Sequence, residues 1–241
     1  SLDSFREETN SHTRKIPDGR SFDKAIQAID WFSGYEGLSV ITTITGYNVK
    51  DLPELVRFLH AKRVGCVLLN PVRATRKDVL KLRPDEGKLT DYFIKAVTEA
   101  ARLSKGSENR IIIGNFSNII LGIIAPQARR LMCDISPCGG GRCFFAITAG
   151  GEMIPCGEFI GLKEFYGGNI FNTSIKKAVF SLAFKKIRER IAEKIAECET
   201  CLYRNICGAP CPAEVYSLSK NLNTKSPYCE FYKKIIDYAF K

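Results

Sequence analysis

The sequence predicts an α/β protein in two parts: a partial (β/α) barrel over residues 1–125, then a small α+β domain with a β-hairpin and cysteine-rich loops over residues 126–241. Three observations support this prediction. Short apolar runs alternate with amphipathic stretches in the first part, which is typical of parallel sheets covered by helices. The composition changes at Cys138, where glycine and cysteine become frequent. Four cysteines then fall within one short stretch, Cys198 to Cys211, with the spacing C-x2-C-x5-C-x3-C.

The first elements follow from hydrophobic periodicity. Residues 1–14 have the composition of a strand end that continues as a polar loop, and Ser21 is placed to cap the helix that follows. Residues 38–45 are rich in β-branched side chains and predict a strand. Asp51 and Glu54 form a capping-box pattern, so the next helix is expected to begin there.

A third strand is predicted over residues 65–72, a nearly continuous apolar run, and a helix over residues 88–104. Only about three strands of this kind are present, whereas a closed barrel needs roughly 200 residues or more. An isolated half barrel would leave a long open edge. We therefore expect the chain to start inside a barrel domain.

The second part predicts a hairpin, because residues 144–148 and 153–156 are short apolar strands joined by Gly150-Gly151. A basic helix is expected over residues 174–196, and a terminal helix after Cys229. The periodicity of the basic helix indicates a solvated charged face. Its basic residues are Lys176, Lys177, Lys185, Lys186, Arg188, Arg190 and Lys194.

Composition limits the class of protein. The chain has 241 residues, 45% of them hydrophobic, and a formal charge of +10, which by itself fits either nucleic acid or an acidic peptide as a partner. No apolar run approaches the roughly 18 residues of a membrane span, and the first residues lack the layout of a signal peptide. We therefore expect a cytoplasmic protein without a membrane partner. Thiols stay reduced in the cytoplasm, so the ten cysteines favour metal ligation over disulfides.

Eight of the cysteines suit two sites with four thiolate ligands each, and no histidine lies near them. Iron–sulfur clusters and zinc both accept such ligands. Two cysteines are left over. Cys66 lies in an apolar strand and is expected to be a small buried hydrophobe. Cys133 precedes Cys138 by five residues, the offset that also separates Cys138 from Cys143, so Cys133 could replace one of them as a ligand.

The cysteine spacing resembles the seven-cysteine signature of the SPASM domain, the auxiliary-cluster module of radical SAM enzymes. The matching residues are Cys138-x12-Gly151-x4-Cys156, then Cys198-x2-Cys201-x5-Cys207-x3-Cys211, then Cys229. The first part is similar to the late barrel of the same superfamily. The residues that carry this likeness are Ser1-Leu2-Asp3, Gly46-Tyr47-Asn48 and Leu69-Asn70-Pro71-Val72.

The resemblance implies two auxiliary [4Fe-4S] clusters. The family pattern assigns Cys138, Cys143, Cys156 and Cys211 to the first cluster and Cys198, Cys201, Cys207 and Cys229 to the second. It also implies that Ser1 and Arg14 bind the amino-acid part of S-adenosyl-L-methionine (SAM). In this family SAM is cleaved reductively to a 5′-deoxyadenosyl radical that removes a hydrogen from the substrate. The expected partners are a ribosomally made peptide or small protein as substrate and an electron donor such as flavodoxin or ferredoxin. Nucleic acid is not expected.

The sequence departs from the family at two points. The motif C-x3-C-x2-C, which leaves one iron open for SAM, is absent from these 241 residues. We therefore expect an inactive fragment of a longer enzyme, the alternative being a degenerate relative. Sulfatase-maturing members have an aspartate directly after the cysteine equivalent to Cys156, whereas this chain has Gly157-Glu158. Glu158 remains a candidate acid or base. The competing hypothesis is a non-catalytic adaptor, stabilised by iron–sulfur clusters or zinc, that binds a peptide or nucleic acid.

Overall fold

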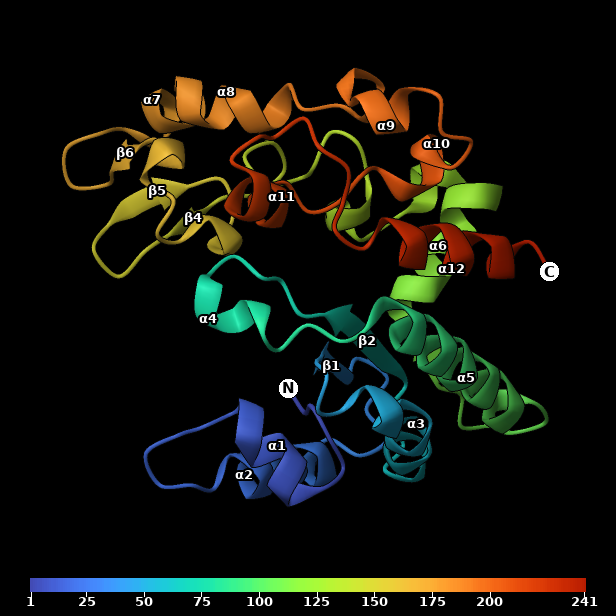
Figure 1. The fold of residues 1–241 in the computed structure, drawn as a ribbon. Coiled ribbons are helices and arrows are strands. Elements are labelled where there is room, and N and C mark those ends of the chain that lie inside the picture. The colour runs from blue at the N-terminus through green and yellow to red at the C-terminus, as the bar shows by residue number, and fades with distance from the viewer. The chain divides into compact units, whose positions relative to one another are not determined.

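The computed structural model describes all of residues 1–241 and divides into two compact units (Figure 1). Unit 1 comprises residues 1–72, 81–120 and 237–241, and unit 2 comprises residues 73–80 and 121–236. Each unit contains one small sheet among helices, so the predicted α/β class is confirmed. No helix is both long enough and apolar enough to cross a membrane.

Unit 1 is built on a parallel sheet of three strands in the order β1 (Ser39–Ile44), β2 (Cys66–Pro71), β3 (Ile112–Ile113). β1 and β2 pair over six residues, from Ser39 opposite Cys66 to Ile44 opposite Pro71. The Leu2 N–H donates to the Ile41 carbonyl at 3.1 Å, so the first residues continue the sheet beyond β1. The two long strands and the strand end at residues 1–3 were predicted from the sequence, whereas β3 was not.

The helices of this part of the chain are α1 (Glu7–Thr13), α2 (Ser21–Trp31), the 3₁₀ turn η1 (Val49–Asp51), α3 (Leu52–Ala61), α5 (Glu86–Ser104) and α6 (Gly114–Ile124). α3 and α5 pack against each other and bury Leu55, Leu59 and Phe93 almost completely. Burying one such side chain stabilises the fold by about 1.5–3 kcal/mol. The predicted helices that begin near residues 51 and 88 are therefore confirmed.

Three local predictions for unit 1 are wrong. Residues 7–13 form a helix instead of a loop, because the buried Asn10 side chain accepts the Asp3 N–H at 2.8 Å and fixes the turn. Ser21 is the first residue of α2, with Arg20 at the cap position and no side-chain capping bond. Asp51 does precede α3, but it too makes no capping hydrogen bond. Tertiary contacts thus set these helix ends in place of local capping.

Unit 2 contains an antiparallel sheet in the order β4 (Ala146–Ile147), β5 (Glu152–Ile154), β6 (Gly168–Asn169). β4 and β5 form the predicted hairpin, and Gly151 in its turn has φ +87°, a conformation that glycine adopts without strain. The third strand, β6, was not predicted, since two residues carry no alternating pattern. The 3₁₀ turns of this part are η2 (Pro126–Ala128), η3 (Met132–Asp134), η4 (Gly157–Phe159), η5 (Lys163–Phe165) and η6 (Ala192–Lys194).

The α-helices of the second part are short: α4 (Lys77–Leu80), α7 (Ile175–Val179), α8 (Leu182–Arg188), α9 (Ala196–Glu199), α10 (Arg204–Cys207), α11 (Pro212–Ser219) and α12 (Cys229–Ala239). The terminal helix is confirmed as α12. The single helix expected over residues 174–196 is wrong. Ser174 and Ser181 each accept a backbone N–H at a new helix start, and this local bond interrupts the helix.

A charged cluster on α5 leads to a first prediction. Glu99 accepts hydrogen bonds from Arg102 at 2.7 and 3.0 Å and from Arg57 at 2.6 Å. The Arg102 bond, followed by that of Arg57, lowers the pKa of Glu99 to about 2. A depressed folded-state pKa stabilises the fold above the unfolded value near 4.5 and loses that effect as the pH falls toward 2.

We expect Glu99→Gln to reduce the free energy of unfolding by about 1 kcal/mol at neutral pH, because both arginines are half exposed or more and solvent screens the pair. Urea denaturation at neutral pH and again near pH 3 should show the difference shrinking in acid. Glu54→Gln is the matched control, since Glu54 is half-exposed and pairs with the same Arg57 at 3.1 Å. A difference of equal size at both pH values would contradict this account.

Candidate metal centres

Four cysteines of unit 2 line one pocket: Cys198, Cys201, Cys207 and Cys229. They come from α9, the turn after it, α10 and the first residue of α12. Two cationic side chains, Arg204 and Lys233, line the same pocket. We call these four cysteines the second cysteine group. The structure thus brings together the residues that the sequence assigned to one cluster.

The second cysteine group is positioned by single helical turns. The Cys201 N–H donates to the Cys198 carbonyl at 3.0 Å, and the Cys207 N–H donates to the Tyr203 carbonyl at 2.8 Å. α10 ends at Gly208, where φ is +66°, and a Cβ there would lie 2.6 Å from the carbonyl carbon of Ile135. Glycine is therefore required at this position, and it lets the cysteine loop lie directly against residue 135.

No three side chains of the types His, Cys, Asp and Glu lie close enough together to hold a single metal ion. Thiolates that share one zinc ion at about 2.3 Å would lie about 4 Å apart. In a four-iron cluster each thiolate binds a different iron, so the sulfur atoms lie around a larger volume. Four thiols around a common pocket supply the ligand set of a four-iron cluster.

Three further cysteines, Cys138, Cys156 and Cys211, pack against one apolar cluster of unit 2. The buried members of that cluster are Ile154, Phe159, Leu162, Phe165, Ile187 and Ala213. The Gly140 N–H lies 3.4 Å from the Cys138 Sγ, and a Cβ on Gly140 would lie 3.3 Å from the Cys156 Cβ. A glycine turn therefore holds Cys138 and Cys156 close to each other.

The structure places Cys133 and Cys143 differently with respect to these three. Burial is the main cause that raises the pKa of the Cys133 thiol to about 11, and Asp134, Cys138 and Cys156 contribute, although the residue keeps an exposed surface. Cys143 is exposed as well, and neither Cys133 nor Cys143 is among the main charged neighbours that shift the pKa of Cys138 or Cys156. The neighbours of the three cysteines thus include Cys133, the alternative that the sequence left open.

Burial also governs the protonation of the ligand candidates. It raises the pKa of Cys207 to about 12 and that of Cys211 to about 12. Both thiols are therefore protonated at neutral pH in the absence of metal. Iron binds the thiolate form, so occupation of these sites releases protons.

Arg190 lies between the two sets of cysteines. It is 4% exposed and donates to the carbonyls of Ala209 at 2.8 Å, Leu222 at 2.6 Å and Thr224 at 3.2 Å. Burial lowers its pKa, while Cys211, Cys198 and Cys138 act in the opposite direction. The sequence placed Arg190 on a solvated face, and this is wrong, because α8 ends at Arg188 and the chain then turns inward. Its guanidinium can offset the negative charge of thiolate ligands on both sides.

A second cation that is largely buried, Arg73, was missed by sequence reasoning. Its guanidinium lies 3.6 Å from the Glu214 carboxylate and 3.4 Å from the Tyr232 hydroxyl, and Glu214 has no exposed surface. Burial alone would lower the pKa of Arg73, but Tyr232, Cys211 and Glu214 raise it. Burial raises the pKa of Glu158, and the nearby charge of Arg73 acts in the opposite direction. Glu158, the predicted acid or base, therefore lies in the same polar cluster as Arg73. In the sequence Arg73 is a single basic residue after an apolar strand, and that pattern does not predict the contacts of its guanidinium with Glu214 and Tyr232.

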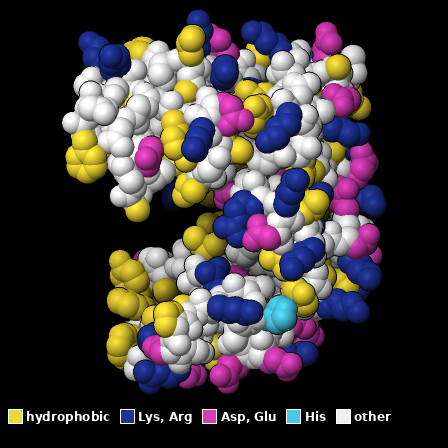
Figure 2. All heavy atoms as spheres, turned by 60° about the vertical axis from the view of Figure 1, so that its left-hand side comes forward, with side chains coloured by type: hydrophobic (Ala, Val, Ile, Leu, Met, Phe, Trp, Pro, Cys, Tyr) yellow, Lys and Arg dark blue, Asp and Glu magenta, His cyan; other side chains and the backbone are white.

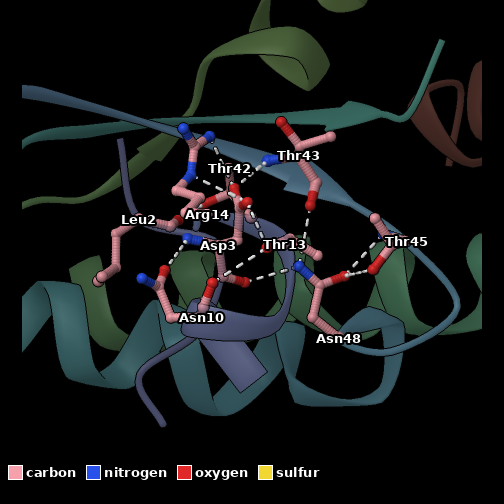
Figure 3. Close-up of polar contacts among 9 residues, drawn as sticks. All are labelled: Leu2, Asp3, Asn10, Thr13, Arg14, Thr42, Thr43, Thr45 and Asn48. Carbon is pink, nitrogen blue, oxygen red and sulfur yellow. Dashed lines mark hydrogen bonds and ion pairs between the residues drawn. The ribbon is translucent and has the colours of Figure 1, made fainter. Parts of the chain in front are cut away.

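In unit 1 the structure brings together the two residues assigned to SAM. Arg14 makes a two-point contact with the buried Asp3, its Nη2 and Nε each lying 2.9 Å from a carboxylate oxygen (Figure 3). Asp3 also accepts the Thr43 N–H at 2.8 Å. Ser1 is exposed and lies within electrostatic reach of Arg14. Arg14 is thus held in place by Asp3 beside Ser1.

Known proteins resemble this chain in sequence and in fold. A family model described as SPASM, an iron-sulfur cluster-binding domain, matches residues 138–202. An uncharacterized protein of Archaeoglobus fulgidus is 49% identical over 238 residues, which make up 98% of this chain and 55% of that protein. The chain therefore spans about half the length of this curated relative.

Solved structures share the fold at low identity. One described as native anSMEcpe with bound AdoMet has a TM-score of 0.77 at 18% identity, over 99% of this chain and 65% of that one. Another of the same protein, with bound AdoMet and Cp18Cys peptide, has the same TM-score and identity over 99% and 66%. Streptococcus suis SuiB bound to S-adenosylmethionine has a TM-score of 0.59 at 14% identity, over 95% and 52%.

These matches confirm the resemblance drawn from the cysteine spacing. Residues 138–202 match the SPASM iron-sulfur cluster-binding domain. The chain as a whole shares its fold with anSMEcpe and SuiB.

Proposed function

We propose that this chain is the part of a radical SAM enzyme that binds two auxiliary [4Fe-4S] clusters, and that the enzyme modifies a ribosomally made peptide. The observation that carries the proposal is the convergence of Cys198, Cys201, Cys207 and Cys229 on one pocket at the spacing of the SPASM signature. We assign residues 1–125 to the radical SAM barrel and residues 126–241 to the SPASM domain. The chain lacks C-x3-C-x2-C, so we propose that it does not cleave SAM by itself.

We assign the second cluster to the second cysteine group and the first cluster to Cys138, Cys156, Cys211 and Cys133, which we call the first cysteine group. Cys133 replaces Cys143, which the family pattern had suggested, because the thiol of Cys133 lies within electrostatic reach of Cys138 and Cys156. When bound, such clusters accept or donate single electrons. Arg190 offsets the charge of the thiolates, and the Gly140 N–H donates to the Cys138 sulfur.

A peptide substrate is supported by the fold relative that was solved with a bound peptide. Ser1 and Arg14 are proposed to hold the amino-acid part of SAM, with the Arg14 guanidinium oriented by Asp3. Glu158 is the proposed proton acceptor or donor, because it lies in the polar cluster of Arg73 and Glu214 near Cys156. All ten cysteines are free thiols, which supports a reducing, cytoplasmic location and an electron donor such as flavodoxin or ferredoxin.

Anaerobic reconstitution tests the proposal. We expect a brown protein that binds about eight irons and about eight sulfides per chain, since two four-iron clusters are proposed. Iron and sulfide analysis, together with electron paramagnetic resonance after reduction, would measure this. A colourless protein purified with stoichiometric zinc would instead support the adaptor hypothesis.

A further inference from the structure

One surface of unit 2 combines exposed cations with exposed apolar side chains on α7 and α8. It consists of Lys176, Lys177, Lys185, Lys186, Phe180 and Leu182, and we call it the basic aromatic face. Phe180 is 72% exposed and Leu182 is 76% exposed. Figure 2 shows Lys and Arg side chains beside hydrophobic ones at the upper left, where α7 and α8 lie in Figure 1.

The charge of this face is strongly one-sided. No Asp or Glu occurs between Glu164 and Glu189 in the sequence. Of the four lysines only Lys185 is in a salt bridge, with Glu189 at 3.6 Å, and Glu164 lies within electrostatic reach of Lys186. Lys176 and Lys177 therefore present their full charge to solvent. Such a positive surface attracts a partner with a negative one and speeds their association.

The buried side of α8 lies against the turn that holds Cys138. Arg188 Nη1 donates to the Gly141 carbonyl at 3.3 Å, and a Cβ on Gly141 would lie 3.2 Å from the Phe184 ring. The residue before Gly141 in the chain, Gly140, donates its N–H to the Cys138 sulfur. One helix, about 10 Å across, thus separates the basic aromatic face from the first cysteine group.

We propose that the basic aromatic face docks a small acidic protein that carries one electron, and that the electron passes through α8 and the glycine turn to the cluster at Cys138. This rests on the proposed function. One electron leaves the carrier and reduces the cluster, and no bond or proton is transferred. Charge complementarity favours an acidic occupant of this face. The short path to Cys138 favours a redox protein over a lipid surface, because a lipid would gain nothing from lying close to a cysteine site.

The test uses the holoprotein with both clusters reconstituted, and flavodoxin as the acidic probe. We expect Lys176→Glu combined with Lys177→Glu to weaken flavodoxin binding at least about tenfold at low salt, and to slow cluster reduction by photoreduced flavodoxin by a similar factor. Lys88→Glu combined with Lys95→Glu, two exposed positions on α5 with the same change in charge, should alter both by less than about twofold. Reduction by a small neutral photoreductant should be unchanged in either variant.

Several results would overturn the proposal. Binding and reduction rates that survive the lysine reversals would do so, and so would retention by anionic phospholipid vesicles at a salt concentration where flavodoxin does not bind. Lys176→Gln combined with Lys177→Gln should give an intermediate loss, which separates charge from folding defects. Iron analysis of the same samples reports on the proposed function separately, because a failure to bind flavodoxin with eight irons present contradicts only the docking surface.

Discussion

Cys207→Ala is expected to remove about half of the iron that the reconstituted chain binds, about four of eight irons. Cys207 lines the pocket of the second cysteine group, and burial raises the pKa of its thiol to about 12, so no solvent ligand can replace it readily. Cluster binding and local folding are coupled. The variant should therefore also unfold at a lower temperature than the wild type, as measured by circular dichroism under anaerobic conditions.

Cys66→Ala is the matched control for this experiment. Cys66 lies in β2 of unit 1 and packs closely against Gly114, since a Cβ on that glycine would lie 3.2 Å from the Cys66 sulfur. Burial raises the pKa of the Cys66 thiol. Its loss leaves a small cavity in the sheet but no missing ligand, so the iron content should stay at that of the wild type. Iron that is fully retained in Cys207→Ala, or lost to the same extent in Cys66→Ala, would show that the pocket is not a cluster site.

The parts of the fold that were predicted are those whose pattern is local. β1, β2, α3 and α5 are long enough to show a hydrophobic period, and each lies within a few residues of its predicted limits. α1, β3 and β6 are short, and contacts from distant residues determine them. Asn10, for example, reaches back to Asp3. The break between α7 and α8 depends on Ser181, whose capping bond competes with a helical period that otherwise continues.

The candidate site divides in the same way. The loop from Cys198 to Cys211 brings three of its four cysteines to one pocket because they are close in sequence, and this could be predicted. The burial of Arg190 and Arg73 could not, since a basic residue next to a helix is usually solvated. The choice between Cys133 and Cys143 was also beyond the sequence, because both lie five residues from Cys138.

Cys133→Ala is expected to remove about four of eight irons, and Cys143→Ala to remove none. Desolvation, Asp134 and the thiols of Cys138 and Cys156 together raise the pKa of Cys133, which places its sulfur beside the first cysteine group. The Cys143 N–H donates to the Gly139 carbonyl at 2.7 Å, and its side chain is exposed. The turn from residue 139 therefore directs Cys143 to solvent while it holds Cys138 inside.

Double variants make this test independent of how the two sites are coupled. Cys133→Ala combined with Cys207→Ala should leave almost no iron, because each cysteine group then lacks a ligand. Cys143→Ala combined with Cys207→Ala should keep about four irons at the first cysteine group. If the second of these pairs instead loses all its iron and the first keeps about half, Cys143 is the ligand and the assignment of Cys133 is wrong. Either outcome fixes the fourth ligand, because both candidates are exposed and occupy equivalent places in the sequence around Cys138.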